Sequence, residues 1–183
     1  MDTQRYPHAE ALAVAEELKA ALSPACERIE IAGSLRRGKP DVGDIELLCI
    51  PRALDRLWLT EGYDQLDVAV RQMIAAGQLR KRLAENGRFA GYGPQNKLMV
   101  DVASGIGVDL FSTTLANWGM AMFVRTGPVE WNMRMMSHFR EIGMRGHAYG
   151  GVEGSDGQQI DCPDEETVFR LLGWQYMPPE ERK

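Results

Sequence analysis

Two carboxylates separated by one residue open an apolar run in the first third of the chain. Asp44 and Glu46 flank Ile45, and the run continues to Ile50 as a strand would. Because successive side chains of a strand point to opposite faces of the sheet, both carboxylates must project from one face. Such a pair is unfavourable without a cation, and carboxylates combined with substrate phosphates suit Mg²⁺. Isolated Asp-x-Glu tripeptides are common, so the neighbouring sequence must decide between a metal site and a solvated strand face.

The segment before these carboxylates has the chemistry of a phosphate-binding turn. The run Gly33-Ser34-Leu35-Arg36-Arg37-Gly38 follows a short β-rich segment and leads toward Asp44 through a further glycine-containing turn. Glycine lets backbone N–H groups approach a phosphate, Ser34 adds a hydroxyl donor, and a guanidinium binds phosphate oxygens as a fork. Each motif alone is weakly specific. Together they indicate a site for a triphosphate and a metal ion.

Apolar spacing and turn signals predict the remaining elements. Helices are expected at residues 9–22, 64–76, 131–142 and 164–172. Strands are expected at 98–102 and 106–111, joined around Ser104-Gly105, followed by an apolar run at 120–124. A turn is expected at Asn86-Gly87, and residues 143–157, with six glycines, read as a loop. This pattern predicts an α+β fold with a mixed, mostly antiparallel sheet flanked by helices, and a small α-rich C-terminal subdomain.

A third carboxylate is expected from a neighbouring strand, and Asp101 and Asp109 are the two candidates. With a two-residue turn at Ser104-Gly105, Asp109 would pair with Val100 and the two acids would point to opposite faces. A three-residue loop would instead put both acids on one face. The register of the hairpin therefore decides which acid can lie beside Asp44, and the sequence leaves that register open.

Residues 24–46, which contain the Gly-Ser turn and the Asp-x-Glu pair, resemble the palm of bacterial and viral family X DNA polymerases, within the nucleotidyltransferase superfamily. Residues 172–182 resemble the C-terminal signature of that family, and Arg125-Thr126-Gly127 resembles the motif between its palm and thumb. The resemblance spans nearly the whole chain and leaves no room for the lyase, helix-hairpin-helix or metallophosphatase-like regions of longer members. It therefore implies a minimal form, with a palm at residues 1–126 and a thumb at 127–183.

The resemblance implies a DNA-directed DNA polymerase that adds nucleotides to a primer 3′-hydroxyl, with short-gap repair synthesis as the family default. It favours Asp109, in the context Val-Asp-Leu-Phe, as the third metal ligand. Asp44, Glu46 and Asp109 would then be the catalytic residues and would bind two Mg²⁺ ions, for which Mn²⁺ can substitute. Asp109 would also accept the proton of the attacking hydroxyl.

The resemblance also implies a nucleotide-binding set. The residues expected to hold the terminal phosphates are Gly33, Ser34 and Arg37, and those expected at the sugar and base edge are Thr126, Gly127 and Asn132. Arg36 is expected to point to solvent or to have a structural role. Animal members carry an aromatic pair where this chain has Val124 and Arg125, so we expect weaker exclusion of ribonucleotides.

The formal charge of −5 argues against a broadly basic nucleic-acid surface, so any grip on primer-template or gapped DNA must be local. The basic residues available for it are Arg80, Lys81, Arg82 and Arg88, with Arg134, Arg140 and Arg145 in the thumb. The chain shows no membrane-spanning run and no signal peptide, and its three cysteines lack metal or disulfide spacing, so we expect a cytoplasmic monomer.

The sequence is compatible with two other functions. The first keeps the fold and changes the acceptor, giving a nucleotidyltransferase that acts on a small molecule, a protein or an RNA end. The second is a DNA-binding or assembly module with a relict site, which would not need Mg²⁺. Trp118, Trp131 and Trp174 could stack on bases, but their helix and strand positions favour core packing, and they are left out of the site.

Overall fold

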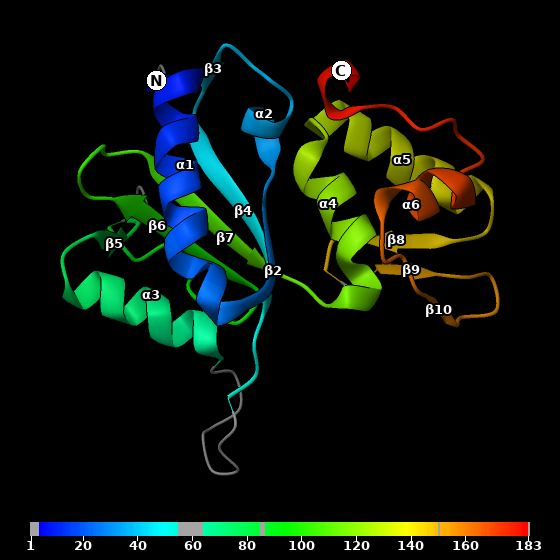
Figure 1. Ribbon diagram of the computed structural model, residues 1–183. Coiled ribbons are helices and arrows are strands. Elements are labelled where there is room, and N and C mark those ends of the chain that lie inside the picture. Colours follow the sequence, from blue (N-terminus) through cyan, green and yellow to red (C-terminus); the bar gives the residue numbers. More distant parts are fainter. Residues whose placement is uncertain (1–3, 55–63, 85–86, 150, 183) are drawn as a thin grey trace.

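The computed structural model describes residues 4–54, 64–84, 87–149 and 151–182. Within them, five strands form a mixed sheet in the order β2-β4-β7-β6-β5 (Figure 1). Their bounds are β2 Cys26–Ile31, β4 Asp44–Pro51, β5 Leu79–Lys81, β6 Asn96–Asp101 and β7 Gly107–Ser112. Neighbouring strands are antiparallel except β4 and β7, which are parallel. The predicted mixed, mostly antiparallel sheet is confirmed.

Helices α1 (His8–Leu22) and α3 (Gln65–Ala75) cover one face of this sheet (Figure 1). The buried side chains between them come from both helices and from alternate strand positions, among them Ala11, Ala15, Leu22, Leu66, Val70, Ile45, Leu47, Cys49 and Val108. The Asp64 carboxylate begins α3 by accepting the backbone N–H of Asp67 at 2.7 Å, and Gly77, at φ +74°, follows its end. Both helices were predicted within two residues of these bounds.

Helix α4 (Trp118–Thr126) covers the opposite face and separates it from a second core. Its Trp118, Ala121 and Met122 pack on the sheet, while Met120 and Phe123 pack into the C-terminal core. The apolar run at residues 120–124 was therefore not recognised as a helix from the sequence. A helix buried on two sides shows a continuous apolar run, and such a run has no periodicity that distinguishes it from a buried strand.

The C-terminal core lies between α4 and two further helices, α5 (Val129–Glu141) and α6 (Glu165–Leu171), both predicted. Strands β8 (Arg145–His147), β9 (Gly151–Glu153) and β10 (Gln159–Ile160) form a small antiparallel sheet beside them. The prediction of a loop over 143–157 was wrong here, because strands of two or three residues rich in glycine show no alternating apolar pattern. Among these three strands, Gly151 and Val152 of β9 are the buried residues.

The remaining short elements connect these layers. They are β1 (Tyr6–Pro7) paired with β3 (Asp41–Val42), the four-residue helix α2 (Gly33–Arg36), and 3₁₀ turns at Ser23–Ala25, Leu115–Asn117 and Pro179–Glu181. Of the predicted turn at Asn86-Gly87, Asn86 lies outside the described residues, while Leu83 and Phe89 on either side form an antiparallel bridge.

The three cysteines are free and buried. The prediction that the three tryptophans pack in the core is confirmed. Trp118 and Trp131 are core residues, and Trp174 packs against the C-terminal core. The described helices include none that combines the length and the apolar character of a membrane span.

Candidate active site

The parallel pairing of β4 and β7 brings three carboxylates to one face of the sheet. Asp44 lies opposite Gly107, and Glu46 lies opposite Asp109. Because residues two apart in a strand share a face, Asp44, Glu46 and Asp109 project together. They lie on the face that α4 covers further along, since Leu48 and Phe111 continue the same two rows and pack against that helix.

Asp101 projects from the opposite face. In the β6–β7 hairpin Leu98 pairs with Asp109 and Val100 pairs with Gly107. The connecting loop is therefore two residues longer than the two-residue turn, which was one of the two alternatives that the sequence left open. A shift of two residues preserves the face, and the two acids still point apart. Asp101 closes its own turn, because its Oδ2 accepts the backbone N–H of Ser104 at 2.8 Å and the Ser104 hydroxyl at 2.7 Å.

Burial and mutual repulsion disturb the ionisation of the carboxylates. Burial, with the neighbouring charges of Asp44 and Asp109, raises the pKa of Glu46 to about 7, although Arg125 and Arg37 oppose the rise. Burial also raises the pKa of Asp109 to about 6, against the lowering effect of Arg82, which forms an ion pair with it. The charged forms of both acids are therefore poorly stabilised near neutral pH.

A divalent cation suits this donor set chemically. Carboxylate oxygens are hard ligands, and a cation between them would offset the repulsion that raises both pKa values. Among the described residues, however, no group of three His, Cys, Asp or Glu side chains is already gathered tightly enough to hold a metal ion. The Arg82 guanidinium is hydrogen-bonded to the Asp109 carboxylate, so a metal ion bound by all three acids would have to displace it.

The Gly-Ser turn lies directly against Glu46. Gly33 begins α2 at φ +66°, and a Cβ placed there would overlap the Glu46 carboxylate. The glycine predicted to let a phosphate approach thus also lets Glu46 approach the turn. Ser34 is half-buried in the first turn of α2, and this short helix over part of the predicted polar turn was not foreseen.

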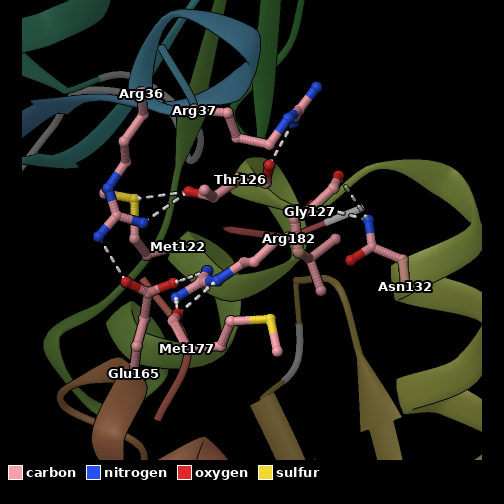
Figure 2. A network of polar contacts seen from close by, with 10 residues as sticks. Arg36, Arg37, Met122, Thr126, Gly127, Asn132, Glu165, Met177 and Arg182 are labelled. Atoms are coloured by element: carbon pink, nitrogen blue, oxygen red, sulfur yellow. Dashed lines mark hydrogen bonds and ion pairs between the residues drawn. The ribbon is translucent and has the colours of Figure 1, made fainter. Parts of the chain in front are cut away.

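The two arginines of the turn connect it to the end of α4, as Figure 2 shows. Arg36 donates to the Thr126 hydroxyl at 2.7 Å and to a Glu165 carboxylate oxygen at 2.5 Å, which is the structural role expected for it. Arg37 donates to the Thr126 backbone carbonyl, and burial lowers the pKa of its guanidinium. The Nε of Arg37 is buried and has no hydrogen-bond partner among the described residues.

The three residues expected at the sugar and base edge gather at the same place. Thr126 is fully buried. Asn132 donates from Nδ2 to the carbonyls of Val124, at 2.8 Å, and Gly127, at 3.3 Å, so it caps the last turn of α4 (Figure 2). Its Oδ1 is buried and has no partner within the described part of the chain. A Cβ on Gly127 would come within 2.6 Å of that oxygen, so this position accepts only glycine without rearrangement.

The sequence analysis missed the residues that complete this junction. Glu165 bridges Arg36 and Arg182, the latter 1% exposed, and Arg182 also donates to the Met177 carbonyl (Figure 2). Glu165 and Arg36 are 129 positions apart in sequence, and no local pattern links them. Arg82 was predicted only as part of a DNA-binding patch, because its contact with Asp109 depends on strand pairing.

Comparison with known proteins finds one domain. Residues 121–183, which contain most of α4, all of α5 and α6, and the small sheet, match the family model of the DNA polymerase beta thumb. No curated protein matches the chain. The thumb model covers about a third of the chain and leaves out the carboxylates and the Gly-Ser turn. Over these residues the match agrees with the resemblance to family X DNA polymerases seen in the sequence.

Proposed function

We propose that this protein is a DNA-directed DNA polymerase of the family X type, which extends a primer 3′-hydroxyl in short-gap repair synthesis. The observation that carries the proposal is the register of β4 and β7, which sets Glu46 beside Asp109 with Asp44 on the same face. The adjoining Gly-Ser turn and the thumb match support it further. The partners would be nucleoside triphosphates and gapped or primer-template DNA.

Two Mg²⁺ ions, or Mn²⁺ in their place, held by Asp44, Glu46 and Asp109 would lower the pKa of the attacking hydroxyl and stabilise the leaving pyrophosphate. Asp109 would accept the hydroxyl proton, because its carboxylate lies in the same row as the other two metal-binding acids. Before Asp109 can do so, its carboxylate must leave Arg82.

The Gly-Ser turn would hold the terminal phosphates. Gly33 and Ser34 would offer backbone and hydroxyl donors, and Arg37 would offer its guanidinium. Arg37 already donates a hydrogen bond to the Thr126 carbonyl, so a movement of Arg37 on nucleotide binding would also move the end of α4. Thr126, Gly127 and Asn132 would then act on the sugar and base edge through the conformation of this helix end, since Thr126 itself is fully buried.

The test is extension of a labelled primer across a one-nucleotide gap with Mg²⁺ or Mn²⁺. Native protein, Asp109→Asn and Asp101→Asn form a matched set. Each substitution removes one carboxylate, the two residues lie on neighbouring strands, and their side chains point to opposite faces of the sheet. We expect templated addition that only Asp109→Asn abolishes. Addition of a nucleotide to a small molecule, a protein or an RNA end, without primer extension, would replace the polymerase with a transferase of another acceptor.

A further inference from the structure

Arg125, in the last turn of α4, lies over the sheet face that carries the carboxylates. Its guanidinium carbon is 3.6 Å from the ring centroid of Phe111 and 4.8 Å from that of Tyr149. Phe111 follows Asp109 by two residues in β7, so the two side chains are neighbours on one face, roughly 7 Å apart along the strand. The two rings therefore fix a positive charge at the end of the carboxylate row.

No hydrogen bond or ion pair of the Arg125 side chain occurs within the ranges that the structure describes, and this side chain is half-buried. Its charge nevertheless acts on the site, because it lowers the pKa of both Glu46 and Asp109. Arg37 lowers the pKa of Glu46, whereas Arg125 lowers that of Asp109 as well, so the Arg125 charge also acts on the Asp109 side of the row.

A guanidinium that is held by stacking and keeps its N–H groups unpaired is prepared to bind an anion. We propose that Arg125 binds a phosphate group of the nucleoside triphosphate beside Asp109, as a substrate-binding residue separate from the Gly-Ser turn. The inference rests on the proposed function for its substrate. It gives this position, where the sequence departs from the aromatic pair of animal members, an attractive contact with the polyphosphate.

The first measurement is the affinity for a non-hydrolysable deoxynucleoside triphosphate analogue with Mg²⁺ and without DNA, by calorimetry. The variants are Arg125→Ala, Arg125→Lys and Arg28→Ala. Arg28 is a matched control, because it is also stacked on a ring, 4.1 Å from the centroid of Trp118, and pairs across the sheet with Ile50, four residues along β4 from Glu46.

We expect Arg125→Ala to weaken analogue binding about tenfold to a hundredfold, the range for loss of hydrogen bonds to a charged group. Arg125→Lys should lie between Ala and native, because it keeps the charge and loses the fork. Arg28→Ala should bind as the native protein does. In primer extension the KM for the nucleotide should rise more than kcat falls, and Arg125→Lys should restore part of it.

Three results would overturn the inference. The first is an equal affinity of native protein and Arg125→Ala for the nucleotide analogue. This holds also if the affinity of Arg125→Ala for DNA falls, because Arg125 would then contact a primer phosphate. An equal loss in Arg28→Ala would reduce the effect to net charge. If the native protein binds no analogue, the proposed function fails together with the inference, whereas analogue binding without primer extension removes the polymerase alone and leaves the Arg125 contact standing.

Discussion

Removal of the Glu165 carboxylate tests the junction between the sheet and the C-terminal core. Glu165 is 6% exposed, and its two oxygens contact Arg36 and Arg182 at 2.5 Å each. In Glu165→Ala the buried Arg182 loses its counter-charge, and among the described residues it keeps the Met177 carbonyl alone as a hydrogen-bond acceptor. Breaking such a pair costs about 3–5 kcal/mol, and we expect about 3, because the partly exposed Arg36 can turn to water.

The assay is urea unfolding followed by tryptophan fluorescence, with thermal melts in parallel. At about 2–4 °C per kcal/mol for a chain of this size, the melting temperature of Glu165→Ala should fall by about 6–12 °C. Glu165→Gln should lie between Ala and native, because its amide oxygen still accepts one hydrogen bond. The exposed neighbour supplies the control, since Glu166→Ala should stay within about 0.5 kcal/mol of native. A loss below about 1 kcal/mol in Glu165→Ala would refute the reasoning, because the bridge would then behave as a surface ion pair.

Two further predictions concern the carboxylates. Gly33→Ala should abolish primer extension, because its Cβ would overlap the Glu46 carboxylate. Gly77 is the control, since it also has a positive φ but has open space around it. Both substitutions should lose about 1–2 kcal/mol of stability from the strained backbone, and Gly77→Ala should keep full activity. Without Mg²⁺ the melting temperature should fall as pH rises from about 4 to about 7, because the raised pKa values of Glu46, about 7, and Asp109, about 6, make the folded state hold protons more tightly. The destabilisation by the two ionised acids is absent below this pH range and complete above it, so Mg²⁺ should raise the melting temperature most above pH 7. Equal melting temperatures with and without Mg²⁺ above pH 7 would contradict a metal site at these acids.

Local patterns predicted the parts of the fold that local rules govern. The amphipathic helices and the β6–β7 hairpin have regular spacing, and Asp44 and Glu46 share a face whatever strands lie beside them. The sequence could not predict the register that separates Asp101 from Asp109, because register is a property of two strands together.

The missed features share a different cause. Helix α4 is buried on two sides and lacks the polar stripe by which a surface helix is recognised. The contacts of Arg82 with Asp109 and of Glu165 with Arg36 join residues far apart in sequence, and they exist only after the sheet and the C-terminal core have formed. Charged residues that pair in this way look like solvated residues in a linear sequence.

The position of α4 between two cores also bears on how the chain unfolds. One side of the helix packs on the sheet through Ala121 and Met122, and the other packs in the C-terminal core through Met120 and Phe123. Melting of either core would strip one side of this helix, and loss of the helix would in turn open the other core to water. The parts of the chain before and after Thr126 should therefore not unfold independently of each other. We expect the chain to denature in a single cooperative transition.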